Sequence, residues 1–550
     1  MTVGTIVQAL APECTLLIGA CVVLVLGVTG QPLRARWVPW FTLVTVLAAL
    51  LWTLGWGTAN HGEVVPGLWL TSLTHYTRCI TLVVGAFIVL VNWRQSAPAE
   101  HGEYMGLILF SMLGVLLTAS ANDLIVLFFA IELVSVPTYV LIALSRTDAR
   151  ASEAAVKYFF LGALSAAILA FGFSYLYGAM GTTTIHRFIG GAAESNVSMV
   201  RPMGAHMVIG LLLVFGGLAF KIAAVPLHVY AADVYEGAAA PIAGLLGFVP
   251  KAAGFVALCK VLGACDWNLP IEVRWVIWFV AAATMTVGNV LGLLQKNVKR
   301  MLAYSSIAHT GYMLVALLVG PVAGQGPMRD GVAALLFYIA VYGVMNLGAF
   351  ACLSAFQSGE REVETLDDLG GLARRAPGAT LGLAICVFSL MGFPPTAGFF
   401  GKLYVFSSAF ALRPSHPLHD ALIVLVIIGV ANSVVAAAYY LRIVAAAYWG
   451  REVDPVVPAG GSPVRWGLAL CSLPLLLLFV WPSSLTDEAS SATTDLRRAI
   501  RPSYARLTSS VGSVDPSPPV PGASPEINPP DGPGNLVAPR SSTHDADSDP

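Results

Sequence analysis

Three lysines lie inside or beside long apolar runs of this 550-residue chain, where a charged side chain is costly. They are Lys221, Lys251 and Lys402, and a carboxylate, Glu132, interrupts a fourth apolar run. A charge at the centre of a membrane-spanning helix costs roughly 2.5–3.5 kcal/mol on insertion scales, so such residues pair, face water or carry a function. Buried lysine can release its proton, whereas arginine keeps its own. Only seven of the 30 basic residues are lysine, so its use in these runs indicates proton chemistry.

Glu132 needs a partner from another helix, because its own apolar segment, NDLIVLFFAIELVSVPTYVLIAL, contains no basic residue. Lys221 is the natural candidate. A buried ion pair can simply fix the packing of two helices. It can also set the proton affinity of the lysine, since a nearby carboxylate favours the charged form of an amine. We favour the second interpretation, because charges within a membrane are usually functional.

Lys251 and Lys402 both follow prolines in apolar segments. A lysine near the end of a segment can extend to the membrane interface, and Lys260 fits that description better than Lys251 does. Lys251 lies deeper, so we expect it to relay protons. Lys402 comes after the Pro394–Pro395 break and is expected to be the last titratable group towards the outer face.

His309 lies in a segment that is unusually polar for a membrane helix, with Ser305, Ser306, Thr310 and Tyr312 around it. Histidine is the side chain best suited to gain and lose a proton near neutral pH. A single histidine in a helix is often only a hydrogen-bonded core residue, so a structural role also stays open. We include His309 in the expected proton relay.

Four further titratable residues, Lys157, His228, Asp233 and Glu236, lie near the predicted inner face. Lys157 begins a helix, where it either anchors the helix at the interface or tunes the central row of charges. The other three follow a helix break, where they either form a proton entrance or cap a turn. We expect neither a catalytic residue nor a cofactor-binding residue in the chain.

The composition places these residues in a membrane protein. Hydrophobic residues make up 57% of the chain and charged residues 11%, against about 25% charged residues in soluble domains. The net charge of -1 gives no electrostatic basis for binding nucleic acid. Eight cysteines are scattered without CxxC or CxxxC spacing, so neither a metal site nor an iron–sulfur cluster is expected.

About 14 segments approach the ~20 apolar residues that a membrane-spanning helix needs. The first of them lacks a preceding basic region, so we expect a retained helix rather than a cleaved signal. Basic residues are enriched roughly two to one in alternate loops, which predicts that those loops are inside and both termini outside. The chain is therefore predicted to be an all-α polytopic protein of the lipid bilayer.

Two of the expected helices are broken. Glycine and proline interrupt the segment around Lys221 and the segment just before Lys402. Proline removes a backbone donor, and backbone groups freed within a membrane need partners from protein or water. Broken helices in corresponding places indicate repeats around a transport path. The two breaks are five helices apart, an odd spacing that inverts one repeat relative to the other.

This reasoning divides the chain into five parts. Residues 1–102 hold three transmembrane helices, residues 103–262 and 273–447 hold the two inverted five-helix repeats, and residues 464–482 hold the last helix. Residues 483–550 are rich in proline and serine and are expected to be disordered. Within that last part, TDLRRAIRPSYARL is a candidate for a short interfacial helix.

Three long stretches make the chain resemble a known family. They are FKIAAVPLHVYAADVYEGAAAPIAGLLGFVPKAAGF, QKNVKRMLAYSSIAHTGYMLVAL and GFPPTAGFFGKLYVF. In this order they are similar to the antiporter-like membrane subunits of respiratory complex I, the NADH–quinone oxidoreductase. The resemblance covers roughly residues 5–482. Lys402 argues against subunit M, which typically has glutamate there, and the Pro-rich C-terminal part argues against the longer subunit L.

The resemblance implies a 14-helix subunit of a proton-translocating membrane arm, coupled to quinone reduction elsewhere in the complex. The family's relay positions fall on Glu132, Lys221, Lys251, His309 and Lys402. The chain itself would perform no redox chemistry and hold no cofactor; NADH, flavin, iron–sulfur clusters and quinone would belong to the complex. The implied partners are other membrane-arm subunits, including antiporter-like subunit M and small subunits, in a bacterial plasma (inner) membrane.

Two other functions are compatible with these residues. A cation/proton antiporter subunit shares the same motifs, and sodium-dependent proton exchange without quinone reduction would favour it. A structural membrane subunit would anchor its neighbours without conducting protons. Unchanged pumping after neutralisation of both Lys221 and Lys402 would favour that second alternative.

Overall fold

The computed structural model describes residues of the chain up to position 496. The described residues are 3–28, 37–56, 62–93, 100–146, 148–185, 204–265, 267–322, 326–358, 361–412, 416–451, 456–494 and 496. Most of the segment expected to be disordered, including nearly all of TDLRRAIRPSYARL, lies outside them.

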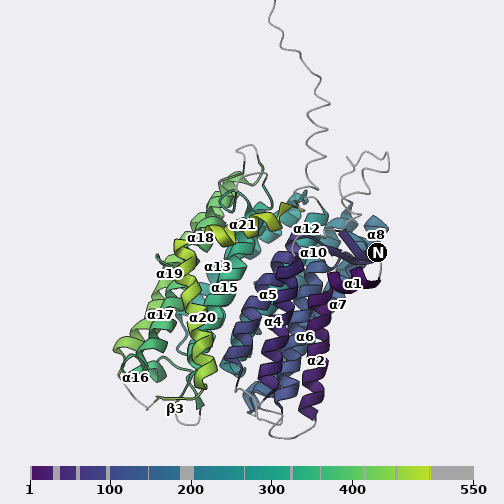
Figure 1. Cartoon of the computed structure of the whole chain (residues 1–550). Helices are drawn as coiled ribbons and strands as arrows, with labels where there is room; N and C mark the ends of the chain where they lie inside the picture. The colour runs from purple at the N-terminus through teal and green to yellow at the C-terminus, as the bar shows by residue number, and fades with distance from the viewer. Residues whose placement is uncertain are drawn as a thin grey trace, which may run out of the picture. The chain divides into compact units, whose positions relative to one another are not determined.

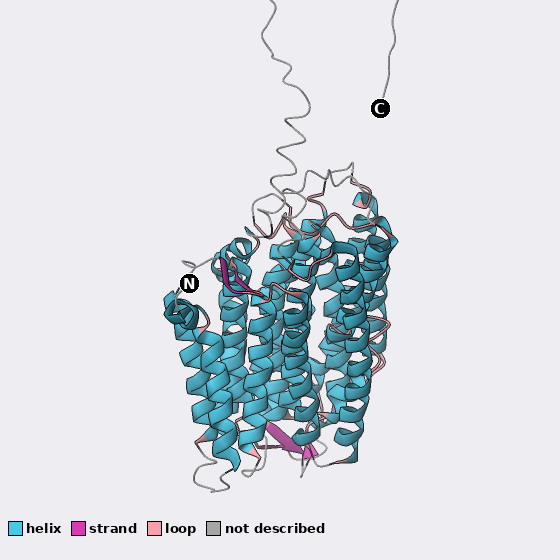
Figure 2. Ribbon diagram, turned by 90° about the vertical axis from the view of Figure 1, so that its right-hand side faces the viewer, coloured by secondary structure: helices cyan, strands magenta, loops and turns pink. Residues whose placement is uncertain are grey.

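Long apolar helices that run side by side dominate the described residues (Figure 1; Figure 2). Twelve of these helices are long and apolar enough to cross a membrane. They are α2 (Ala11–Val28), α4 (Val38–Trp56), α5 (Ser72–Val91), α6 (His101–Ser120), α7 (Leu124–Ser145), α8 (Ala149–Met180), α12 (Ala240–Ala264), α13 (Ile271–Leu293), α14 (Val298–Val319), α15 (Gly331–Ser354), α19 (His419–Trp449) and α20 (Gly461–Val480). Two shorter apolar helices, α10 (Ala205–Lys221) and α17 (Pro377–Met391), complete the fourteen predicted segments.

Short helices and strands lie at the two ends of the helix bundle. Helix α1 (Val3–Ala9) lies beside the antiparallel strands β1 (Gly62–Val65) and β2 (Leu68–Leu70). At the other end, β3 (Phe356–Ser358) pairs antiparallel with β4 (Arg361–Glu362) and with β5 (Val456–Pro458). We call these the α1 end and the β3 end (Figure 1). The remaining short helices are α11 (Ala231–Gly237), the 3-10 helix η2 (Asp367–Leu369), α16 (Leu372–Arg375), α18 (Ala397–Ala409) and α21 (Ser483–Ala492).

Helix α21 begins inside the segment 483–550 that was expected to be disordered, and the structure differs from that expectation at residues 483–492. Its side chains Thr486, Ala489 and Ala492 are buried, and the helix packs on α5 and α15. Residues three apart share one face of a helix. Small side chains on this face allow a polar helix to lie closely against the bundle, which its composition does not reveal.

Helices α12, α14 and α15 form the centre of the bundle. The apolar span of α12 is 100% buried within the chain, and the spans of α14 and α15 are 94% buried. Only 33% of the spans of α4 and α19 is buried, and large apolar side chains such as Leu51 and Val434 point outwards from them with 70% exposure. The outer helices therefore suit contact with lipid, whereas polar groups on the central helices are shielded by protein.

Local capping signals explain where several helices begin. Side chains preceding α8, α14 and α15 each accept a hydrogen bond from a backbone N–H in the first turn; they are Asp148, Asn297 and Asp330. The first N–H groups of a helix have no partner within it, and such caps satisfy them. The caps thus fix the starting points of the helices that carry the candidate site.

Both predicted helix breaks are present. Helix α10 ends at Lys221, and residues 222–230 separate it from α11. Helix α17 ends at Met391, and residues 392–396 separate it from α18. Gly392 ends α17 with φ +82°, a conformation that glycine adopts without a steric penalty. The breaks therefore lie where the prolines and glycines predicted them.

The helix packing repeats between the two halves of the bundle. Helix α6 packs on α7 and α8 packs on α10; in the second half, α13 packs on α14 and α15 packs on α17. The last helix of each half, α12 or α19, packs against the first two. Each half thus has five helices in the same arrangement, with the fourth one broken. The limits 103–262 and 273–447 stay predictions.

Candidate functional site

Lys221 and Glu132 form the buried ion pair that the sequence predicts. The Nζ atom of Lys221, at the end of α10, lies 2.9 Å from Oε1 of Glu132 on α7. It also donates to Ser135 Oγ at 2.7 Å and to the Tyr139 hydroxyl at 3.5 Å. Residues 132, 135 and 139 are spaced by three and four, so they share one face of α7. The Lys221 side chain is 3% exposed and that of Glu132 is 20% exposed.

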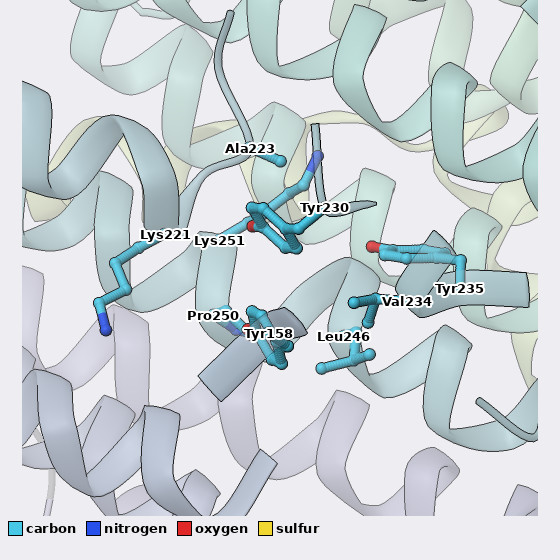
Figure 3. A pocket seen from close by; sticks show the side chains of 9 residues that line it. All are labelled: Tyr158, Lys221, Ala223, Tyr230, Val234, Tyr235, Leu246, Pro250 and Lys251. Atoms are coloured by element: carbon cyan, nitrogen blue, oxygen red, sulfur yellow. The ribbon is translucent and has the colours of Figure 1, made fainter. Parts of the chain in front are cut away.

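A small cavity, with room for about one water molecule, lies beside both Lys221 and Lys251. Both lysines line it together with the rings of Tyr158, Tyr230 and Tyr235 (Figure 3). The Tyr158 and Tyr230 rings are stacked with their centroids 5.0 Å apart. In Figure 3 the Lys221 side chain points away from these tyrosines, in agreement with its bond to Glu132. A change in the position of the Lys221 side chain would be needed for direct transfer between the two lysines.

Lys251 lies at the centre of α12 and is held by α14. Its Nζ donates to the Thr310 hydroxyl at 2.7 Å and to the backbone carbonyl of Ser306. It also lies 5.4 Å from the centroid of the Tyr342 ring on α15, where a cation gains from the negative face of the aromatic ring. The residue is 3% exposed. Among the described residues no carboxylate lies within ion-pair distance of this ammonium group.

His309 lies on α14, three residues beyond Ser306, and bridges two tyrosines. Its Nδ1 is 2.7 Å from the Tyr338 hydroxyl on α15, and its Nε2 is 3.0 Å from the Tyr440 hydroxyl on α19. A hydroxyl both donates and accepts hydrogen bonds, and a neutral imidazole has one nitrogen of each kind. The histidine therefore joins helices of the second half through groups that can pass a proton in either direction.

Lys402 lies on α18, directly after the second break, and extends back across it. Its Nζ donates to the Met391 carbonyl at 2.8 Å, the last carbonyl of α17. It also lies 5.0 Å from the centroid of the Tyr312 ring on α14. Gly392 leaves room for this side chain, because a Cβ atom there would approach Lys402 Cδ to 2.8 Å. The lysine is 6% exposed.

Lys157, Asp233 and Glu236 meet at the surface of the β3 end. Lys157 Nζ lies 2.9 Å from Asp233 Oδ2, and Arg300 Nη1 lies 2.9 Å from Asp233 Oδ1 and 2.6 Å from Glu236 Oε2. The four side chains are between 26% and 43% exposed. Ion pairs of this exposure contribute about 0–1 kcal/mol. His228 lies in the irregular chain before α11 and takes no part in these ion pairs.

Lys260 departs from the sequence-based expectation. It is 9% exposed, and its Nζ donates at 2.7 Å to the carbonyl of Ala121, the residue that caps the C-terminus of α6. A cation near a helix C-terminus is favoured by the helix dipole. The expectation that Lys260 extends to the membrane interface is therefore wrong, because α12 is enclosed by other helices along its whole length.

A second group of charges at the β3 end was not predicted. Lys299 is fully buried, and its Nζ lies 3.2 Å from Glu362 and 3.3 Å from Glu364. Glu364 also pairs with Arg146 at 2.6 Å, and Glu362 accepts hydrogen bonds from the backbone N–H of Ala240 at the start of α12. We call Arg146, Lys299, Glu362 and Glu364 the β3-end clamp. It ties α7, α12 and α14 to the chain around strand β4.

The charge balance of the clamp shows in the pKa of Glu364. Burial alone would raise the pKa of this carboxyl group, but Lys299 and Arg146 outweigh that effect and hold the pKa below its usual range. The carboxylate form is thus favoured by the two neighbouring cations. The sequence signal for this clamp was the run of carboxylates in REVETLDD, close after a predicted helix. The basic partners of these carboxylates come from distant segments, so the sequence did not predict the ion pairs.

Hydroxyl groups and carbonyls hold most of the five residues expected to form the relay. Ser135, Thr310, Tyr338 and Tyr440 contact Lys221, Lys251 or His309 directly. Sequence analysis did not single out Tyr338 and Tyr440, although a tyrosine within a buried apolar helix is a signal that its hydroxyl needs a partner. No group of three or more His, Cys, Asp or Glu side chains suited to a metal ion occurs among the described residues.

Comparison with known proteins identifies the family of the chain. The family described as NADH:quinone oxidoreductase/Mrp antiporter, transmembrane, matches residues 121–434, which include all five residues expected to form the relay. NADH-quinone oxidoreductase subunit N of Paramagnetospirillum magneticum is 34% identical over 488 residues, covering 88% of this chain and 96% of that protein. Subunit N 1 of Solibacter usitatus is 36% identical over 463 residues, with coverages of 82% and 90%.

A solved structure also resembles this chain in fold. A chain of respiratory complex I from Thermus thermophilus with bound aureothin is 29% identical, with a TM-score of 0.71, and the match covers 87% of this chain and 99% of that one. The chain therefore belongs to the NADH:quinone oxidoreductase/Mrp antiporter family of transmembrane subunits, and within it to the group named subunit N of NADH-quinone oxidoreductase.

Proposed function

We propose that this chain translocates protons through Glu132, Lys221, Lys251, His309 and Lys402 as a membrane-arm subunit of an NADH–quinone oxidoreductase. The names of its relatives support the assignment to that complex. Redox chemistry, with NADH, flavin, iron–sulfur clusters and quinone, belongs to other subunits. This chain contributes the proton path and carries no cofactor of its own.

The burial of Lys251 is the observation that carries the proposal. Its ammonium group is buried at the centre of α12 and is held by a carbonyl and a hydroxyl rather than by a carboxylate. Without a counter-ion, desolvation disfavours the charged form of a buried amine, so the charged and neutral forms can approach each other in free energy. A group of that kind can accept a proton from one neighbour and release it to the next.

Lys221 couples the path to the rest of the complex in this scheme. Glu132 is 20% exposed, so it lies at the edge of the chain while its partner is enclosed. Movement of the carboxylate away from Lys221 would remove its stabilising charge and favour release of the proton towards the cavity and Lys251. The break after α10 supplies backbone that can move, because its residues lie outside the helical hydrogen-bond ladder.

The loop charges support an orientation for the proposed path. Basic residues are enriched at the β3 end, which we take as the inner side of a bacterial plasma membrane, with both termini outside. Lys157, Asp233 and Glu236 lie at that end and are candidates for the entrance or for tuning the central charges. His309 then passes protons to Lys402, the last group of the row, on the half-helix that leads to the α1 end.

A pair of substitutions tests the proposal. Lys251→Arg keeps a positive charge that cannot be released, and Lys251→Ala removes the charge. Both should abolish proton translocation by the assembled complex reconstituted into vesicles, measured with a pH-sensitive dye while quinone reduction is followed. Normal translocation by Lys251→Arg would show that residue 251 does not need to release a proton, and the proposal would fail there.

The same vesicles separate the other functions. An antiporter subunit, which the family description also includes, would exchange sodium for protons without NADH. A non-conducting structural subunit would keep full NADH-driven pumping when Lys221→Met and Lys402→Met are combined. Either result would replace the proposed function.

A further inference from the structure

Helix α15 presents a polar stripe to the relay. Tyr338, Tyr342 and Asn346 are spaced by four residues, so they lie along one face of the helix. Tyr338 bonds His309. The Tyr342 ring lies 5.1 Å from the His309 ring and 5.4 Å from Lys251 Nζ. Two of the three members of the stripe therefore contact relay residues, and the third, Asn346, extends the stripe towards the β3 end.

Asn346 has a buried amide group without a hydrogen-bond partner among the described residues. The residue is 1% exposed, and neither Oδ1 nor Nδ2 makes a hydrogen bond to any described residue. The Tyr342 hydroxyl, although near Ser306, also makes no hydrogen bond of standard geometry within the described part of the chain. Buried polar atoms are almost always bonded to protein or to ordered water. A neighbouring subunit cannot be the partner, because the Asn346 amide is enclosed by this chain alone.

The absence of a side chain at Gly247 lets the Asn346 amide pack directly against α12. A Cβ atom at residue 247 would lie 1.9 Å from Asn346 Nδ2, closer than any contact allows. Gly247 precedes Lys251 by four residues, so it lies on the same face of α12 one turn nearer the β3 end. The amide, the Tyr342 hydroxyl and the Lys251 ammonium group therefore line the same interface between α12 and α15.

We propose that Asn346 and Tyr342 bind ordered water beside Lys251, and that this water exchanges protons between Lys251 and the β3 end. An amide and a hydroxyl together offer three donor hydrogens and two acceptor oxygens, enough to supply two of the two to four partners of a buried water. The assignment of proton transfer to this water rests on the proposed function. This water would add a second proton path between Lys251 and the β3 end, one that does not pass through Lys221 or the tyrosine-lined cavity.

The proton step at this site is simple. A hydrated proton held by Asn346 and Tyr342 passes to the neutral amine of Lys251, so that one O–H bond breaks, one N–H bond forms and neutral water stays behind. The start of α12, where Glu362 of the β3-end clamp bonds Ala240, lies seven residues from Gly247. That is about 10 Å along a helix, a distance that a short chain of waters spans.

A density map of the assembled complex, at a resolution that shows ordered water, tests the binding site. We expect a peak within about 2.7–3.2 Å of the Asn346 amide and the Tyr342 hydroxyl. An Asn346 amide that packs against α12 without water, or that bonds directly to another side chain, would overturn the inference whatever the vesicles show.

Two matched glycines test the function of the water. Gly247→Ala places a methyl group against the Asn346 amide, whereas the nearest neighbours of a methyl group in Gly244→Ala, one turn earlier on α12, belong to Leu347 and Phe350. We expect Gly247→Ala and Asn346→Leu to slow NADH-driven proton translocation about tenfold, equal to about 1.4 kcal/mol in a barrier. Gly244→Ala, which crowds the same pair of helices, should stay near the wild-type rate once assembly is matched.

The outcomes separate this inference from the proposed function. Loss of translocation in Lys251→Ala together with wild-type rates in Asn346→Leu and Gly247→Ala would overturn the water branch and leave the relay intact. Equal losses in Gly244→Ala and Gly247→Ala would show that helix crowding is the cause, and would also overturn it. Normal translocation in Lys251→Ala would instead contradict the relay itself.

Discussion

The two broken helices each carry a buried lysine, but the two lysines are held in different ways. Lys221 lies before the first break and pairs with a carboxylate from another helix, Glu132, at 2.9 Å. Lys402 lies after the second break and bonds the Met391 carbonyl, which the break leaves at the end of α17. One charge is balanced by a side chain that can move away, and the other by the fixed dipole of a half-helix.

Under the proposed function, this difference suits the two breaks to different roles. An ion pair can be switched, because displacement of Glu132 changes the stability of the charged lysine by several kcal/mol. A backbone carbonyl stays in place, so the affinity of Lys402 for a proton depends on its surroundings rather than on a partner's position. The first break is thus suited to coupling, and the second is suited to passing on a proton that arrives through His309.

Glu132→Gln should have the largest effect. It leaves the buried ammonium group of Lys221 beside a neutral amide. Removal of one partner of a buried ion pair costs about 3 kcal/mol at the lower end of the usual range. We expect a value at this lower end, because the Glu132 side chain is 20% exposed. The midpoint temperature at which this subunit leaves the purified complex should fall. The double variant Glu132→Gln/Lys221→Met should recover part of the loss; an additive double variant would mean that the two residues are not coupled.

Gly392→Ala should have the next largest effect. Residue 392 has φ +82°, and a Cβ atom there would meet Lys402 Cδ at 2.8 Å. We expect a loss of about 1–2 kcal/mol from backbone strain, read as a lower dissociation temperature. The matched control is Gly216→Ala in α10, where the nearest contact of a Cβ atom is at 3.9 Å. This control should be neutral or slightly stabilising, and equal losses at both positions would contradict the account of the second break.

Lys402→Met should change stability less than Glu132→Gln does. The substitution removes a buried cation that has no carboxylate partner among the described residues. It also leaves the carbonyl of Met391 without a hydrogen bond, at a cost of about 1 kcal/mol. The dissociation temperature should therefore stay close to that of the wild type, while NADH-driven proton translocation is lost. A destabilisation as large as that of Glu132→Gln would show that Lys402 is a structural charge.

Acid should weaken the β3-end clamp, with the smallest effect of the four. The pKa of Glu364 is below its usual range in the folded chain, so its contribution is fully present above the ordinary carboxyl pKa of about 4.3 and is lost as the pH falls through the folded value. We expect Glu364→Gln to flatten the dependence of the dissociation temperature on pH below about pH 5. If the dissociation temperature of this variant falls at low pH as steeply as that of the wild type, the acid sensitivity comes from groups other than Glu364.

Much of this architecture can be predicted from the sequence because its signals are local. Apolar length predicts the fourteen segments, and proline and glycine predict both breaks. The pairing of Glu132 with Lys221 is predictable for a different reason: a charge within a membrane needs a partner, and few are available. The polar helix α21 was not predicted, because it packs on α5 and α15 and its own sequence contains no comparable local signal.

The remaining features depend on contacts between distant segments. Lys299 lies in QKNVKR, a typical interfacial sequence, yet it is fully buried because Glu362 and Glu364 from the chain around β4 lie beside it. Lys260 lies near a helix end, yet other helices enclose it. The Asn346 amide becomes notable only when its burial and its lack of partners among the described residues are known. In each case the packing, rather than the residue's own segment, decides the environment.

Proton translocation by the complex carrying Lys221→Arg tests the central claim most directly. Arginine preserves the positive charge beside Glu132 but does not release its proton. The account predicts that the complex assembles with all its subunits and that NADH-driven acidification or alkalinisation of the vesicles is lost. Translocation at the wild-type rate in this variant would show that the Glu132–Lys221 pair serves packing alone, and would contradict the account.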